Sequence, residues 1–125
     1  MERDQFDELV EQALEEMPEG FKRYLRNVEI AVRNLPTESL ARELGLSRSQ
    51  LLGIFIGVPR TRRQPSFELP SLPERIELYQ QNIERVAETP EEVKHQVRLT
   101  LRHEIGHYFG LSERDLQALE EQRFS

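Results

Sequence analysis

Two histidines and a glutamate near the end of the chain have the spacing of a metal site. His103 and His107 stand four residues apart, and Glu104 follows the first of them. On a helix, side chains at this spacing project from one face, so both imidazoles can reach a single ion. Zinc accepts such ligands, and a neighbouring carboxylate can move a proton from an activated water to a leaving amine. The pattern H-E-x-x-H therefore predicts zinc-dependent peptide hydrolysis with Glu104 as general base.

An open catalytic zinc site needs a third protein ligand besides two histidines. Glu113 stands ten residues after His103, beyond Gly110, which can adopt the left-handed conformation that ends a helix. A chain reversed there can return Glu113 to the metal face, and Asp115 is the other candidate. Ser112 and Asp115 also match an S-x-x-D capping box, and a first-turn carboxylate favours the helix dipole without any metal. The spacing predicts Glu113 as the third ligand and leaves Asp115 as the alternative.

The elements that position these residues follow from the spacing of apolar residues. Helical spacing predicts helices at residues 3–17, 21–25, 38–44, 80–86 and 90–110, and a last helix from residue 112. Alternation or a short apolar run predicts strands at residues 27–32, 51–58 and 75–79. The nearly all-apolar run at 51–58 is expected to be a buried central strand, and Arg75–Tyr79 an edge strand. Residues 60–74 are expected to form a Pro- and Arg-rich loop. This order of elements indicates an α+β fold.

Composition limits the classes of function. A chain of 125 residues suits a single domain, here residues 1–125. The absence of cysteine excludes disulfides and thiolate metal sites, and a net charge of −6 disfavours nucleic acid as a partner. The chain has no apolar stretch long enough to span a bilayer and no signal-peptide pattern at its start. We therefore expect a cytoplasmic protein that does not bind membranes, and the oligomeric state is left open.

Three stretches resemble the small bacterial zincin-like metallopeptidases, or minimal zincins. Residues 103–116 read H-E-I-G-H-Y-F-G-L-S-E-R-D-L, and the family signature is H-E-I-G-H-[HY]-F-G-L-x-D-x-x-L. The run L-L-G-I-F-I-G-V-P at 51–59 is similar to the family's G-x-[YF]-x-G-x-P strand. L-P-E-R-I-E-L-Y at 72–79 is similar to its L-P-x-R-I-x-L-[YF] segment. The resemblance implies a minimal zincin fold, with a small mixed sheet packed on helices that include the H-E-x-x-H helix.

The resemblance also assigns roles to residues. It implies that His103 and His107 bind zinc and that Glu104 is the catalytic base. The third-ligand position falls on Glu113, where the family more usually has Asp. A peptide or protein substrate is implied, bound in a cleft between the motif helix and the sheet. The substrate would pair with the sheet's edge strand, for which Arg75–Tyr79 is the candidate. Three side chains are candidates for stabilising the oxyanion: Tyr79, His95 and Tyr108.

Two other functions fit parts of the sequence. Residues 40–54 match a helix-turn-helix, with Gly45 in the turn and with Arg48 and Gln50 facing a DNA groove. The glycines and apolar residues that follow favour a strand where the recognition helix would lie, and the acidic chain also weighs against this alternative. A metal-stabilised peptide-binding protein without catalysis is the second alternative, because ligands and a base do not by themselves make a competent cleft.

Overall fold

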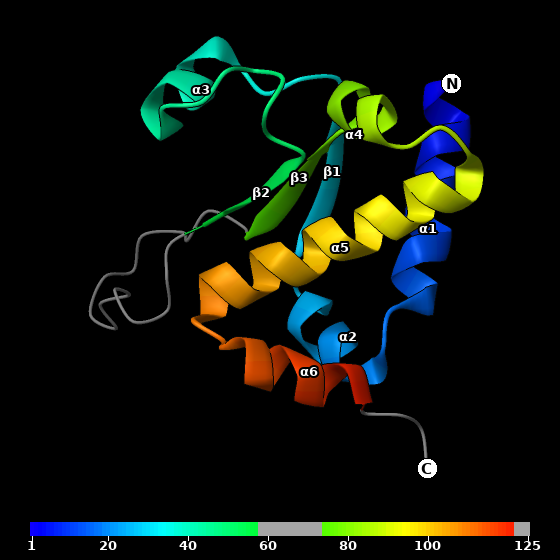
Figure 1. The fold of residues 1–125 in the computed structure, drawn as a ribbon, viewed down its shortest axis with the longest axis vertical. Coiled ribbons are helices and arrows are strands. Elements are labelled where there is room, and N and C mark those ends of the chain that lie inside the picture. The colour runs from blue at the N-terminus through cyan, green and yellow to red at the C-terminus, as the bar shows by residue number, and fades with distance from the viewer. Residues whose placement is uncertain (58–73, 122–125) are drawn as a thin grey trace.

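A computed structural model of the chain describes residues 1–57 and 74–121. Within these residues the chain forms six helices and one three-stranded sheet (Figure 1). The helices are α1 (Arg3–Glu16), α2 (Glu19–Leu25), α3 (Glu38–Leu44), α4 (Gln80–Val86), α5 (Pro90–Phe109) and α6 (Glu113–Glu121). The strands are β1 (Glu29–Arg33), β2 (Gly53–Ile56) and β3 (Arg75–Tyr79). The predicted α+β fold with a small mixed sheet is confirmed. The loop predicted at 60–74 lies outside the described residues except for Glu74.

The sheet has the strand order β1-β3-β2, which reverses two predictions. β3 lies in the centre, parallel to β1 and antiparallel to β2. Arg75–Tyr79 is therefore not an edge strand, and the apolar strand within 51–58 is not central. The alternation in β3 reflects its two different faces: Ile76 and Leu78 are fully buried in the core, whereas Arg75 and Glu77 pair with each other on the other face. β2 is rich in apolar residues because α5 covers one of its faces. It does not have a strand on each side, as the prediction of a central strand required.

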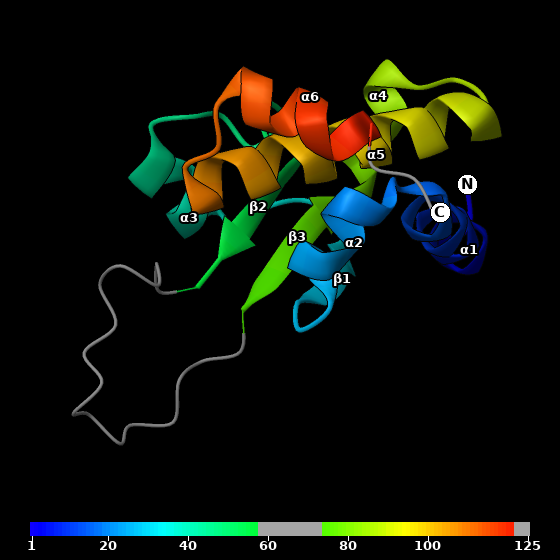
Figure 2. The same ribbon diagram turned by 90° about the horizontal axis from the view of Figure 1, so that it is seen from below.

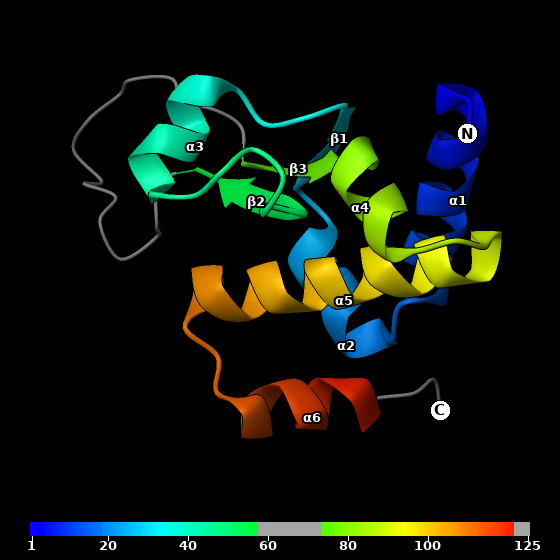
Figure 3. The ribbon, with the colours of Figure 1, turned by 45° about the horizontal axis from the view of Figure 1, so that its top comes forward.

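The main core lies between one face of the sheet and helices α1 and α5. Ile76 and Leu78 of β3 meet buried residues of α1 (Phe6, Leu9, Val10, Ala13) and of α5 (Val93, Val97, Leu101, Ile105). Figures 2 and 3 show α5 between the sheet and α6. α6 adds Leu116 and Leu119 to this core from the opposite side of α5. The long helix that carries the histidines is thus held from both sides.

Gly53 brings β2 directly against α5. A Cβ atom at Gly53 would lie 2.8 Å from both the Glu77 carbonyl oxygen and the Thr100 methyl group. Any larger residue would therefore push the strand away from the helix. The close approach explains why the apolar run contains a glycine at this position, and it places the edge strand beside the motif helix.

The segment 40–54 does not form a helix-turn-helix. α3 ends at Gly45 in the left-handed conformation, with φ 69°, so Gly45 does make the expected turn. Beyond it, Ser47 and Gln50 bond to each other in a tight turn, and β2 begins at Gly53. The second helix that would enter a DNA groove is missing, so this interpretation of the segment is wrong. None of the helices in residues 1–57 and 74–121 combines the length and hydropathy of a membrane span.

Candidate functional site

α5 presents both histidines on its exposed side. The helix starts with Pro90 in its first turn, after Thr89, whose side chain accepts a hydrogen bond from the Glu92 N–H at 3.1 Å. Its inner side is the buried row Val93, Val97, Leu101 and Ile105. Because His103 and His107 are out of phase with that row, both remain exposed. The predicted amphipathic helix is confirmed, and its period sets where the histidines point.

The two imidazoles lie next to each other. The ring centroids of His103 and His107 are 4.3 Å apart, and the ring planes are inclined by 40°. Two neutral imidazoles at this separation on one exposed face can donate nitrogen ligands to the same ion. The helix therefore places side by side two of the three side chains that the sequence analysis predicts as zinc ligands.

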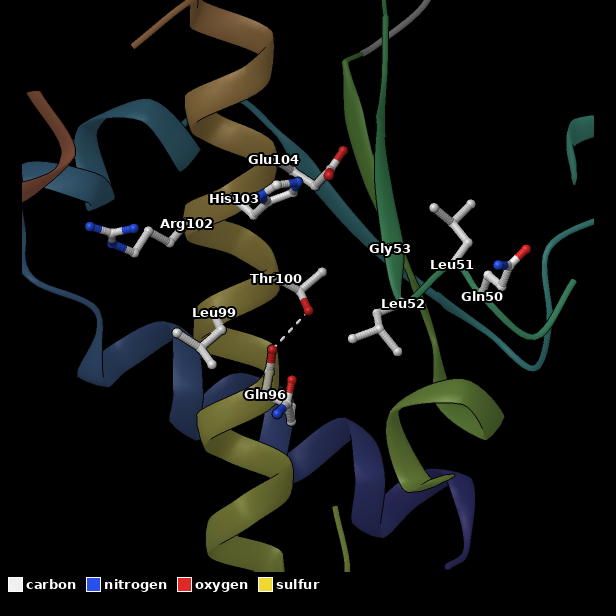
Figure 4. A pocket seen from close by; sticks show the side chains of 10 residues that line it. All are labelled: Gln50, Leu51, Leu52, Gly53, Gln96, Leu99, Thr100, Arg102, His103 and Glu104. Carbon is white, nitrogen blue, oxygen red and sulfur yellow. Dashed lines mark hydrogen bonds between the residues drawn. The ribbon is translucent and has the colours of Figure 1, made fainter. Parts of the chain in front are cut away.

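Glu104 is half-buried and bridges α5 and the edge strand. Its Oε1 accepts a hydrogen bond of 2.9 Å from the backbone N–H of Phe55 in β2. Phe55 lies opposite Ile76 in the register, and its N–H points away from β3 toward α5. Figure 4 shows the Glu104 side chain directed from α5 toward β2. The edge strand thus orients the carboxylate that the sequence predicts as general base. The sequence did not indicate this contact, because the donor is a backbone group.

Glu113 lies beside α5, but its carboxylate faces Arg102. The Arg102 Nη2 donates to Glu113 Oε1 at 2.7 Å, and the Arg102 Nε donates to Glu120 at 2.9 Å. The hydrogen bond and charge of Arg102 hold the pKa of the Glu113 carboxyl below its usual value. The structure does not bring Glu113 to the histidines, and no three His, Cys, Asp or Glu side chains gather as a metal site within the described ranges.

Asp115 completes the capping box at the start of α6. The Ser112 N–H donates to Asp115 Oδ2 at 2.9 Å, and the Asp115 N–H donates to Ser112 Oγ at 3.0 Å. These backbone and side-chain hydrogen bonds lower the pKa of Asp115. The predicted S-x-x-D box is confirmed. The carboxylates of Asp115 and Glu113 are therefore both engaged, the first by the backbone of the capping box and the second by the Arg102 side chain.

The three oxyanion candidates have different surroundings. Tyr79 is fully buried, and burial together with its hydrogen bond to Glu77 raises the pKa of its hydroxyl far above the usual range. His95 lies two helical turns before His103 and is exposed. The Tyr108 ring stacks on Phe55, with centroids 3.8 Å apart and planes inclined by 7°. Tyr108 thus stacks on the strand that holds Glu104.

A cleft opens between α5 and the chain that leads into β2. It has a volume of about 440 Å³. Its lining comprises Gln50, Leu51, Leu52, Gly53, Gln96, Leu99, Thr100, Arg102, His103 and Glu104 (Figure 4). One histidine of the pair and the candidate base therefore form part of its wall. Apart from that histidine and Glu104, the sequence analysis did not single out the lining residues that come from α5.

The family assignment rests on the sequence of most of the chain. A profile of the zincin-like metallopeptidase family matches residues 25–123, a span that includes all three strands and both motif histidines. A comparison with proteins of curated function finds no match. The profile covers more than half of the chain and includes the helix with H-E-x-x-H. The chain belongs to the zincin-like metallopeptidase family.

Proposed function

We propose that the protein is a zinc-dependent peptidase, with His103, His107 and Glu113 as metal ligands and Glu104 as general base. The observation that carries the proposal is the position of Glu104. Its carboxylate lies on the turn that bears His103 and is oriented by the edge strand through Phe55. A glutamate that only faced solvent would not be held by a backbone N–H of a neighbouring strand.

The donor set suits zinc. Two imidazoles and one carboxylate are ligands that zinc accepts in catalytic sites. His103 and His107 already share one face, and Glu113 is exposed on the helix that packs beside them. Glu113 would exchange its contact with Arg102 for the ion. When bound, zinc would polarise the scissile carbonyl and lower the pKa of the attacking water.

Glu104 would move the proton in this reaction. The Phe55 N–H holds one carboxylate oxygen, while Oε2 accepts no hydrogen bond from the residues that the structure describes. Oε2 can therefore take a proton from the attacking water and hand it to the leaving amine. A general base contributes roughly 10²–10⁴-fold to a rate, and this range sets the expected loss when Glu104 is replaced.

The substrate would be an extended peptide on the outer edge of β2, which pairs with no further strand in residues 1–57 and 74–121. The outer side of this strand faces α5, as the bond from the Phe55 N–H to Glu104 shows, and backbone groups on such an edge that are not already bonded can pair with a peptide. β2 thereby takes the role that the sequence analysis gave to Arg75–Tyr79. A peptide-binding protein without catalysis would use the same edge, so only a rate measurement separates the two functions.

The test compares Glu104→Gln with the parent. We expect zinc to copurify with both proteins, as measured by elemental analysis. Hydrolysis of a fluorogenic peptide library should fall by about 10²-fold or more in the variant. Glu43→Gln on α3, at an exposed glutamate outside the cleft, is the matched control and should leave the rate unchanged. Equal hydrolysis by Glu104→Gln and the parent would show that the proposed mechanism is wrong.

A further inference from the structure

Three side chains of α5 face β2 in a single row. Thr100, Glu104 and Tyr108 are spaced four residues apart, so the helical period places them one turn above another. The Thr100 methyl lies against Gly53, where an added Cβ atom would approach it to 2.8 Å. Figure 4 shows Thr100 and Glu104 directed from α5 toward the strand. The candidate base is therefore the middle member of a row of contacts between the helix and β2.

β2 is held by a strand on one side only. Gly53–Ile56 pairs with β3, and the opposite edge pairs with no further strand in residues 1–57 and 74–121. From that edge the Phe55 N–H donates to Glu104 Oε1 at 2.9 Å. A single hydrogen bond contributes little net stability, because water competes for both partners. Further contacts between α5 and β2 are therefore needed to keep the carboxylate and the N–H within bonding distance.

Tyr108 supplies such a contact on the C-terminal side of Glu104. Its ring stacks on the Phe55 ring, with centroids 3.8 Å apart and planes inclined by 7°. The Tyr108 hydroxyl also lies close to Gly57, just beyond β2, where an added Cβ atom would be 3.4 Å from it. The tyrosine therefore covers β2 from Phe55 to Gly57. With the contact at Thr100, it brackets Glu104 from both sides.

Glu74 holds the far end of the Tyr108 side chain. The Tyr108 hydroxyl donates to Glu74 Oε1 at 3.2 Å, and Glu74 is buried. Glu74 directly precedes β3, and its carbonyl oxygen accepts the Glu29 N–H at 3.0 Å, so its backbone is anchored to β1. The hydroxyl that the sequence suggested for the oxyanion thus donates to a carboxylate of the protein. This bond ties the end of α5 to the start of the central strand.

We infer that Tyr108 is a positioning residue for the candidate base. Its ring, held at the hydroxyl by Glu74, keeps β2 against α5, so that the Phe55 N–H stays bonded to Glu104. A carboxylate with one oxygen held in this way presents the other in a defined direction, which general base catalysis requires. The inference rests on the proposed peptidase function, and it adds a residue that acts on the base through β2.

The first test follows hydrogen exchange of the Phe55 amide by NMR in the metal-free protein, so it does not depend on catalysis. Tyr108→Leu should speed this exchange by about tenfold, because an aromatic pair can change a local opening equilibrium by about that factor. Tyr108→Phe keeps the ring and loses only the hydroxyl, so it should retain most of the protection. Parental exchange in Tyr108→Leu, or equal losses in both variants, would overturn the role of the ring.

A matched control separates this local role from general stability. Tyr24 on α2 is also half-buried, and its ring centroid lies 4.8 Å from that of Phe109. Tyr24→Leu should not speed exchange at Phe55 more than at Leu101, whose amide lies in the core part of α5. Tyr108→Leu should speed exchange more at Phe55 than at Leu101. Equal acceleration at these two amides in Tyr108→Leu would mean that Tyr108 only stabilises the fold, and the inference would be wrong.

The second test measures turnover of the peptide that the zinc-loaded parent cleaves best. Tyr108→Leu should lower kcat by about tenfold, Tyr108→Phe by about twofold, and Tyr24→Leu should keep the parental value. Lost protection at Phe55 with an unchanged kcat would overturn the positioning role. If the parent cleaves nothing but Tyr108→Leu still releases the Phe55 amide, Tyr108 does position Glu104 and the proposed function is wrong. If the parent cleaves and neither measurement responds, the proposed function stands and the inference is wrong.

Discussion

The two halves of the H-E-x-x-H-x-x-G-x-x-E motif differ in how they are positioned. His103, Glu104 and His107 lie on α5, where the helical period alone places the imidazoles side by side. Glu113 lies on α6, beyond the reversal at Gly110, and its carboxylate contacts Arg102. The first half needs only a straight, well-anchored helix. The second half needs the turn at Gly110, the packing of α6 on α5, and the release of Glu113 from Arg102.

The anchoring of the two helices explains the difference. α5 is fixed by the buried row that includes Val97, Leu101 and Ile105, so its outer face cannot rotate without opening the core. α6 is placed by Leu116, which packs over Gly106, where an added Cβ would lie 3.1 Å from a Leu116 methyl. This packing sets the helix but not the rotamer of an exposed carboxylate. The packing of α6 can therefore fix the position of the Glu113 backbone, while the Glu113 carboxylate could turn either to Arg102 or to a bound zinc ion.

Removing a proposed ligand on α5 should have the largest effect. We expect His103→Ala to lower zinc affinity by more than the roughly 10–100-fold that loss of an outer-shell partner costs. Competition with a chromophoric chelator measures this affinity. His95→Ala, an exposed histidine two turns earlier on the same helix, is the control and should bind zinc like the parent. Equal losses in both variants would mean that the histidine pair is not the metal site.

Removing the proposed ligand on α6 should have a smaller effect. Glu113→Gln is expected to weaken zinc binding about tenfold, because two imidazoles and the remaining shell still hold the ion. Asp115→Asn should keep the zinc affinity and lower the melting temperature, because it weakens the capping box with Ser112. The reverse result, with zinc lost in Asp115→Asn and kept in Glu113→Gln, would identify Asp115 as the ligand.

The sequence predicted most of what a single element decides. Apolar spacing located the helices and strands, and the i, i+4 rule placed His103 and His107 together. Gly110 does adopt the left-handed conformation, with φ 66°, and Ser112 does cap α6 with Asp115. Each of these features depends on a short stretch of chain and on local geometry, so the residue types were sufficient.

Contacts between elements were less accessible from the sequence. The strand order was reversed because the apolar residues of β2 report coverage by α5, which periodicity cannot distinguish from a second strand neighbour. The Phe55 N–H that holds Glu104 is a backbone donor, and every residue except proline has one. The competition of Arg102 for Glu113 depends on how α6 packs on α5. None of these pairings leaves a periodic signature.

Replacing Arg102 should strengthen zinc binding through Glu113. Arg102→Gln frees the Glu113 carboxylate, and we expect zinc affinity to rise by about two- to fivefold, in keeping with the small contribution of exposed ion pairs. Glu120→Gln is the matched control, because it removes the other partner of Arg102 and leaves the bond to Glu113 intact. Chelator competition measures both. A loss of affinity in Arg102→Gln would show that Arg102 supports the metal site.

The smallest effect concerns pH in the absence of metal. Arg102 lowers the pKa of Glu113 in the folded protein below its ordinary value of 4.5. The ion pair therefore stabilises the fold above pH 4.5, and this stabilisation is lost as the pH falls through the lower folded-state pKa. The melting temperature of the metal-free parent should exceed that of Arg102→Gln slightly at neutral pH, and the two should converge in acid. Thermal melts recorded by circular dichroism from neutral to acidic pH measure the difference. Because the pair is exposed, added salt should reduce the difference as well. A gap that persists in acid would mean that Arg102 stabilises α6 through Glu120 or through packing, and not through the carboxylate that zinc would have to recruit.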